Sequence, residues 1–164
     1  MAGRTHRETT LIGWGFVAAQ FALLAVMVFL PRGVDYTPGP AARIVGAVAM
    51  GTGIAIGLWA ALYLRRGLTP TPVPNGATDL VTKGPYRFAR HPMYSAVVLL
   101  MAGIALRSGS WAVWAAFVGL VVLFHVKSRW EEARLRETFP GYERYLATTG
   151  RFGPLPGLAQ RTDA

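Results

Sequence analysis

The sequence predicts an all-α integral membrane protein with four transmembrane helices and a helical C-terminal extension in the cytoplasm. Three observations support this prediction: the composition, two long uncharged runs and a one-sided distribution of positive charge. The 164 residues are 52% hydrophobic and only 15% charged, with a mean hydropathy of +0.34. That balance is too apolar for an ordinary soluble domain. We interpret residues 1–164 as a single domain.

The first two predicted spans are residues 11–30 and 44–64, and neither contains a charged residue. An uncharged apolar run of about 18 residues or more is typical of a transmembrane helix, because a helix satisfies its own backbone hydrogen bonds in lipid. The first run is too long for the apolar part of a signal peptide, and no small-residue cleavage site follows it, so we expect it to remain as a span. In the second run, Gly53 and Gly57 form a small-xxx-small pattern, which favours close helix packing.

The third and fourth predicted spans, residues 92–107 and 111–127, are shorter, and we expect them to form a tight hairpin. The apolar run 93–106 would be roughly 21 Å long as a helix, against a hydrocarbon core of roughly 30 Å. Snorkelling of Arg107 and Lys127 extends the reach of the pair. The alternative is a hairpin buried against the first two spans that does not cross fully. The fourth helix should continue into a charged extension that ends before Pro140.

The positive charges predict the topology. With four spans, all but three of the 17 lysines and arginines lie on the side of the two termini and the middle loop; the exceptions are Arg32, Arg43 and Arg107. The positive-inside rule then places both termini in the cytoplasm, and we expect a multi-pass protein of a bacterial plasma membrane. The net charge of +9 is explained by contact with anionic membrane lipids, so we expect no nucleic-acid partner.

Several kinds of site are not indicated by the sequence. The chain has no cysteine, which excludes disulfides, thiol catalysis and cysteine-ligated zinc. His6, His91 and His125 do not have the spacing of metal ligands, so no metal is expected. No phosphate-binding glycine loop and no nucleophile elbow are present.

The first candidate site segment is GPYRFARHPMY, residues 84–94, where polar groups directly precede an apolar helix. Pro92 suits a first helical turn. The free amides after His91 would form a positive helix end that can hold a carboxylate. Tyr86 and Tyr94 offer aromatic faces suited to a flat base or a cation. The alternative is an interfacial belt of aromatic and basic residues at headgroup level.

The second candidate segment is the charged end of the fourth helix. Glu131 and Glu132 are adjacent and point about 100° apart, so we expect one to face inward and Glu132 to face solvent. Lys127 lies four residues before Glu131, on the same helix face. For most charges here the alternative is a solvated amphipathic helix with ion pairs.

Together these segments resemble a known family. The chain has R-H-P-x-Y at 90–94, E-E-x-x-L-x-x-x-F at 131–139, then Y-x-x-Y at 142–145 and R-F-x-P at 151–154. This order is similar to that of the isoprenylcysteine carboxyl methyltransferase family and, more broadly, of the membrane methyltransferases that include the phospholipid N-methyltransferases. The resemblance covers roughly residues 79–154. The chain departs from the family pattern at Ala96, where glycine is common, and in a spacing one residue shorter between Phe139 and Tyr142.

The resemblance implies an S-adenosyl-L-methionine-dependent methyltransferase whose cofactor and catalytic region spans about residues 78–154. The cofactor-binding positions that it implies are Thr78, Asp79, Leu80, Val81, Tyr86, His91, Pro92, Met93, Tyr94 and Glu131. Glu131 would pair with the ammonium group of the cofactor. The family's substrate-facing basic residue corresponds to Lys127, with Arg129 as a nearby alternative.

The expected reaction is methyl transfer to a lipophilic carboxylate, as in protein-S-isoprenylcysteine O-methyltransferases. An ionised acceptor needs no general base, so we expect no obligatory acid–base residue, and catalysis by alignment and exclusion of water. An amine or neutral thiol acceptor would need a base such as His91, His125 or a glutamate. The alternatives are therefore methylation of a small thiol or a phospholipid amine, or a non-enzymatic membrane protein on the same scaffold.

Overall fold

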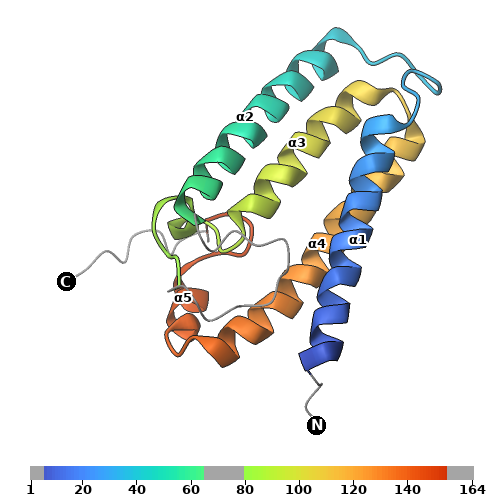
Figure 1. The fold of residues 1–164 in the computed structure, drawn as a ribbon. Coiled ribbons are helices and arrows are strands. Elements are labelled where there is room, and N and C mark those ends of the chain that lie inside the picture. Colours follow the sequence, from blue (N-terminus) through green and yellow to red (C-terminus); the bar gives the residue numbers. More distant parts are fainter. Residues whose placement is uncertain (1–5, 65–79, 155–164) are drawn as a thin grey trace.

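The computed structural model describes residues 6–64 and 80–154, and this part of the chain is helical throughout apart from its connections (Figure 1). The helices in chain order are α1 (His6–Phe29), α2 (Pro40–Leu64), the short 3-10 helix η2 (Gly84–Arg87), α3 (Pro92–Ser108), α4 (Trp111–Thr138) and α5 (Tyr142–Thr148). The predicted cofactor residues Thr78 and Asp79 lie outside the described residues.

Three of these helices are long and apolar enough to cross a membrane. They are α1 from Glu8 onwards, α2 and α4, whereas α3 is a shorter apolar helix of 17 residues. Large apolar side chains are widely exposed on them, for example Phe29, Leu62 and Val118, as expected where lipid surrounds a helix. The four predicted spans therefore correspond to three helices of spanning length and one shorter helix.

The helix ends follow local rules. Pro40 and Pro92 stand at the first positions of α2 and α3, where a missing N–H is tolerated. Helix α4 runs to Thr138 and is followed by Phe139 and Pro140, which confirms the predicted end of the charged extension.

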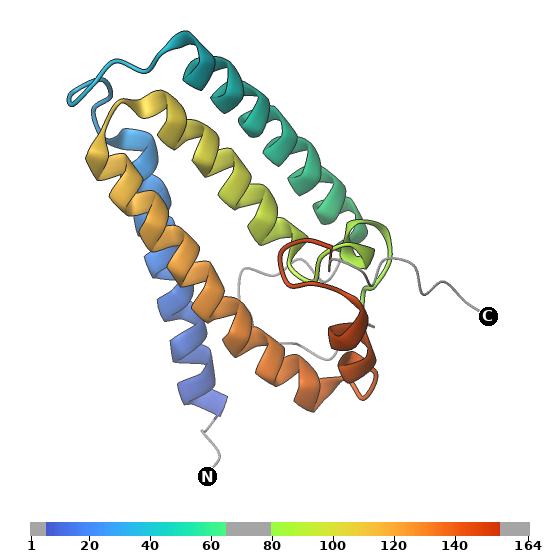
Figure 2. The same cartoon turned by 180° about the vertical axis from the view of Figure 1, so that it is seen from behind.

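Helix α3 packs mainly along α2, while α4 packs mainly along α1. Glycines explain the first pairing, because a Cβ added at Gly53 would lie 2.7 Å from Ala96 O and one added at Gly46 would lie 2.8 Å from Gly103 O. These backbones touch where glycine has no side chain, so the predicted packing role of the glycines in α2 is confirmed. Helices α3 and α4 run in opposite directions after a turn at Gly109 (Figures 1 and 2), but the main partner of α3 is α2 rather than α4.

Gly53→Ala should destabilise the α2–α3 pair by about 1–3 kcal/mol, the usual cost of overpacking a close contact. Gly57→Ala is the matched control, because a Cβ there would lie 3.5 Å from Ala96 Cβ, at ordinary contact distance. Denaturant unfolding of both variants in mixed micelles measures the difference. Equal stability of the two variants would contradict the close approach at Gly53.

The buried core lies where α1, α3 and α4 meet. Its largest buried members are Met27, Met101, Leu120 and Phe124. The connection from α1 to α2 and the turn from α3 to α4 lie at one end of the bundle, whereas the start of α3 and α5 lie at the other end (Figures 1 and 2). The candidate site residues belong to this second end.

The charge distribution predicts the topology of this bundle. A reporter fused at either terminus should score as cytoplasmic, and a reporter inserted between Gly33 and Gly39 should score as external, because most lysines and arginines lie on the side of the termini. Alkaline phosphatase and fluorescent-protein fusions measure the two locations. A fusion after the last helix that scores as external would overturn the assignment.

Candidate functional site

The candidate site forms where a late segment of the chain returns to the start of α3. Ala89 and Gly150 form an isolated parallel β-bridge, and the amides of Arg90 and His91 donate to the carbonyls of Gly150 and Arg151, both at 2.9 Å. The Ser95 hydroxyl donates to the carbonyl of Phe152 at 2.7 Å. Residues 149–152, which we call the closing segment, thereby lie against the helix start.

A buried ion cluster centred on Glu132 fastens the closing segment. Arg151 donates to both carboxylate oxygens, with Nε 3.0 Å from Oε1 and Nη2 2.6 Å from Oε2, and Arg90 Nε lies 3.0 Å from Oε1. Arg90 also donates to the carbonyls of Leu146 and Thr149. The hydrogen bond with Glu132 raises the pKa of Arg151 above its usual range, so Arg151 stays charged. This cluster holds α4, α5 and the closing segment to the start of α3.

The expectation that Glu132 faces solvent is wrong. Its exposed fraction is 4%. The helix alone would leave this position open, but the closing segment covers it and supplies Arg151. The bidentate arginine pair offsets the cost of burying the carboxylate.

Glu131 has a different environment, although it is the adjacent residue. The Tyr94 hydroxyl donates to its Oε1 at 2.5 Å, and His91 Nδ1 lies 3.5 Å from its Oε2. Its side chain is 12% exposed. Among the described residues no lysine or arginine forms an ion pair with it. This carboxylate therefore has acceptor capacity without a permanent cationic partner.

His91 lies between the two glutamates. Its Nε2 is buried and 3.3 Å from Glu132 Oε1, but it makes no hydrogen bond within the described part of the chain. A buried ring nitrogen that contacts a carboxylate without a well-formed hydrogen bond keeps capacity for a ligand. Of the amides after His91 that the sequence suggested for a carboxylate, those of Tyr94 and Ser95 donate to the carbonyl of His91, both at 3.1 Å, so neither is free.

Tyr94 connects His91 to the core of the bundle. Its ring stacks against the rings of His91 and Phe124, with centroids 5.3 Å and 4.5 Å away. Lys127 Nζ lies 5.2 Å from the ring centroid and donates to Gln20 Oε1 at 2.8 Å. Lys127 is buried, at 3% exposed. A buried ammonium group therefore lies one helical turn from Glu131.

The structure brings together only some of the predicted positions. His91, Tyr94, Glu131 and Lys127 converge, and Pro92 starts the helix that carries Tyr94 and has His91 as its N-cap. Arg129 is exposed and lies about 200° around α4 from Lys127, so it does not join them. Of the remaining predicted positions, Leu80, Val81 and Met93 are half-buried. Met93 lies in the first turn of α3.

Tyr86, also a predicted cofactor position, is buried at 7% exposed. Its carbonyl accepts a hydrogen bond from the Tyr145 hydroxyl at 2.5 Å. Burial raises the pKa of Tyr86 to about 12 and also raises the pKa of Tyr142 and of Tyr145. All three phenols therefore stay neutral at physiological pH.

The site also contains residues that were not singled out as candidates. Arg90, Glu132 and Arg151 form the ion cluster, and Phe124 and Gln20 contact Tyr94 and Lys127. Arg90 and Arg151 stand in the R-H-P-x-Y and R-F-x-P motifs, which was the available signal. No local pattern indicates Phe124 or Gln20. In the described ranges no group of three histidine or acidic side chains is placed to hold a metal ion.

Comparison with known proteins matches the amino-acid sequence to one family. Residues 41–141 fit the sequence profile of a family described as phospholipid methyltransferase, which is more than half of the chain. The chain belongs to the phospholipid methyltransferase family. The isoprenylcysteine carboxyl methyltransferases are related to this family, so the resemblance noted in the sequence is confirmed.

Two curated relatives of this phospholipid methyltransferase family member are bacterial. One is the cobalt-zinc-cadmium resistance protein CzcN of Cupriavidus metallidurans, 27% identical over 87% of this chain and 63% of its own length. The other is the nickel-cobalt-cadmium resistance protein NccN of Alcaligenes xylosoxydans xylosoxydans, 27% identical over 87% of this chain and 64% of its own length. The chain thus spans less than two thirds of these relatives. No solved structure shows significant similarity.

Proposed function

We propose that this protein is a membrane methyltransferase that uses S-adenosyl-L-methionine and transfers the methyl group to a lipophilic carboxylate. One observation carries the proposal. Of two adjacent buried glutamates, Glu132 is paired with two arginines, whereas Glu131 has only a tyrosine hydroxyl and a histidine ring as partners among the described residues. Such a carboxylate suits a ligand cation.

The residues present fit the cofactor. Glu131 would hold the ammonium group by a charge-assisted hydrogen bond, and Nε2 of His91, which makes no hydrogen bond within the described residues, would bind a polar group of the same ligand. Bound there, S-adenosyl-L-methionine supplies an electrophilic methyl group on a sulfonium. The ion cluster at Glu132 fixes the helix start that carries His91 and Tyr94.

Lys127 favours an anionic acceptor. Its ammonium group is buried and lies one turn from Glu131. A carboxylate beside it would gain an ion pair in a medium of low dielectric constant, whereas a cationic amine would be repelled. The site would align the acceptor carboxylate with the methyl group of the cofactor. It would also exclude water while the negative carboxylate reacts with the positive sulfonium.

A phospholipid amine is the second candidate acceptor. The family description, phospholipid methyltransferase, supports it. His91, whose Nε2 makes no hydrogen bond within the described residues, could take a proton from an amine acceptor.

The test is methyl transfer by the purified full chain in detergent micelles. We would supply methyl-labelled cofactor with separate panels of prenylcysteines, other lipophilic carboxylates, small thiols and phosphatidylethanolamine. A carboxylate product is a methyl ester, which releases labelled methanol in alkali, whereas methylated amines and thioethers do not. We expect base-labile label, lost in His91→Ala and retained in Arg144→Gln, an exposed arginine on α5.

Other products would change the proposal. Base-stable label on phosphatidylethanolamine would replace the carboxylate with the amine acceptor. Transfer to no acceptor, together with no cofactor binding, would overturn the enzymatic function.

A further inference from the structure

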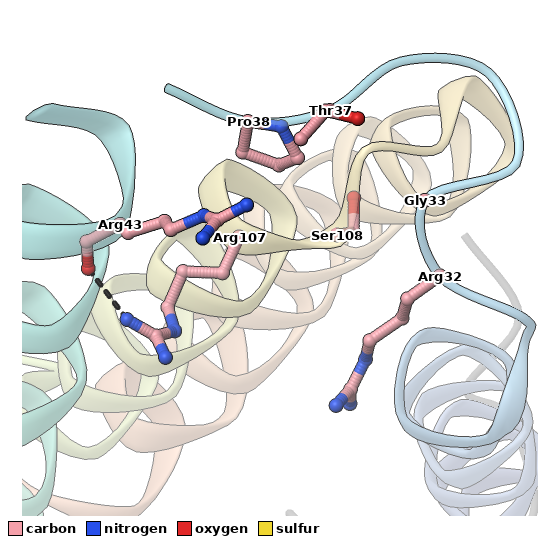
Figure 3. Close-up of a pocket in the computed structure, with 7 residues that line it drawn as sticks. All are labelled: Arg32, Gly33, Thr37, Pro38, Arg43, Arg107 and Ser108. Carbon is pink, nitrogen blue, oxygen red and sulfur yellow. Dashed lines mark hydrogen bonds between the residues drawn. The ribbon is translucent and has the colours of Figure 1, made fainter. Parts of the chain in front are cut away.

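A pocket of about 350 Å3 lies at the end of the bundle opposite His91 and Glu131. It is formed by the connection after α1, the first turn of α2 and the last turn of α3 (Figures 1 and 3). Its lining residues are Arg32, Gly33, Thr37, Pro38, Arg43, Arg107 and Ser108. Such a volume lies within the range of about 300–1,000 Å3 that is typical of small-ligand sites.

Hydrogen bonds fix the wall of this pocket, which we call the arginine pocket. The amide of Gly33 donates to Ser108 O at 2.6 Å, and the amides of Asp35 and Tyr36 donate to Gly109 O at 3.1 and 3.2 Å. Gly109 has a φ of 63°, and an added Cβ would meet the carbonyl of Tyr36. The connection after α1 is therefore fastened to the α3–α4 turn.

The arginine pocket carries three positive charges that are not neutralised. Among the described residues no carboxylate forms an ion pair with Arg32, Arg43 or Arg107. Asp35 belongs to the same connection, but its Oδ2 accepts the amide of Trp111 at 2.6 Å.

Two of the three guanidinium groups are oriented by backbone carbonyls. Arg107 Nη1 donates to Arg43 O at 2.6 Å (Figure 3), and Arg32 Nη2 donates to Val28 O at 3.3 Å. Because a guanidinium has five N–H donors, each retains donors for a ligand.

Aromatic residues indicate the depth of the arginine pocket in the membrane. Tyr36 packs against Trp111, with ring centroids 5.2 Å apart, and its hydroxyl accepts a hydrogen bond from Trp114 Nε1 at 2.9 Å. Trp111 is 67% exposed. Tryptophan and tyrosine at a helix end are typical of the membrane–water interface, where phosphate groups of lipids are located.

We propose that the arginine pocket binds a phosphate ester, at the membrane surface opposite the methyl-transfer site. Arginine matches phosphate oxygens with paired N–H donors, and basic pockets between transmembrane helices are known to hold anionic headgroups. The phosphate belongs either to the headgroup of an anionic phospholipid or to a soluble phosphate compound. This inference does not depend on the proposed methyltransferase function.

The experiment measures binding of three probes to the full chain in neutral detergent by calorimetry. The probes are a short-chain phosphatidylglycerol, inorganic phosphate and a short-chain phosphatidylcholine. The test variant carries Arg32→Gln and Arg43→Gln, both exposed positions outside the packed helix faces. Arg144→Gln at the opposite end, which removes one positive charge instead of two, is the control. Thermal unfolding verifies that each variant is folded.

We expect phosphatidylglycerol to bind the wild type and the Arg144→Gln variant equally. The double variant should bind it at least about tenfold more weakly, which corresponds to losing one or two charge-assisted hydrogen bonds. Phosphatidylcholine should bind more weakly than phosphatidylglycerol, because its headgroup has no net charge. Equal binding of inorganic phosphate would assign the site to a soluble phosphate compound instead of a lipid.

Two results would overturn the proposal. The first is absence of binding by both phosphatidylglycerol and inorganic phosphate. The second is equal weakening per removed charge by Arg144→Gln and by the double variant, which would show a general effect of net charge.

Discussion

Glu132→Gln is expected to lower the free energy of unfolding by about 3–5 kcal/mol, the range for removing one partner of a buried ion pair. The carboxylate is 4% exposed and neutralises Arg90 and Arg151. Without its charge, both arginines would remain partly desolvated beside a neutral amide. The closing segment should then separate from the start of α3. Denaturant unfolding in mixed micelles measures the loss.

Glu143→Gln is the control for this prediction. Glu143 pairs with Arg136 at 3.2 Å, but the two side chains are 71% and 52% exposed. An exposed pair contributes about 0–1 kcal/mol, so the control should unfold almost like the wild type. Similar unfolding of Glu132→Gln and Glu143→Gln would contradict a structural role for the buried cluster.

Glu131→Gln should weaken binding of S-adenosyl-L-methionine by about 1.5–3 kcal/mol, or roughly ten- to a hundredfold, the value of a charge-assisted hydrogen bond. The reason is that Glu131 provides the one buried carboxylate of the described site without an arginine or lysine ion pair. Calorimetry with the cofactor measures the change. The variant should keep most of its stability, because it loses the charge on one hydrogen bond from Tyr94.

The matched control is Glu137→Gln, an exposed position on the same helix. It changes the net charge by the same amount as Glu131→Gln. Because its side chain lies outside the site, it should bind the cofactor like the wild type. An unchanged affinity in Glu131→Gln would remove Glu131 from the cofactor site. Equal weakening in both variants would assign the effect to overall charge.

The helices could be predicted from the sequence because their signals are local. Uncharged runs mark α1 and α2, and Pro92 and Pro140 mark the start of α3 and the region where α4 ends. The main hairpin expectation used chain proximity alone, and only its alternative, a hairpin buried against the first two spans, placed α3 against an earlier helix. The decisive contact involves Gly46, Gly53 and Gly103, and it depends on two backbones meeting across helices.

The site could be predicted in part. The motifs indicated His91, Tyr94, Glu131 and Lys127, and the structure brings these four together. Glu132 was misjudged because helical geometry gives the direction of a side chain but not what covers it. The covering residue Arg151 comes from the closing segment, which lies beyond α5 in the chain. Whether the converging residues bind the cofactor stays a prediction.

The closing segment has a consequence for biosynthesis. Arg90 bonds to carbonyls that lie 56 and 59 residues later in the chain. During synthesis, the residues of α1 to α4 are therefore made before Leu146 and Thr149 exist as partners. Until then, Arg90 must remain hydrated at the membrane surface, since a buried unpaired guanidinium is costly. The nascent protein would lack the cluster that fixes His91 and Tyr94 until the closing segment has been made.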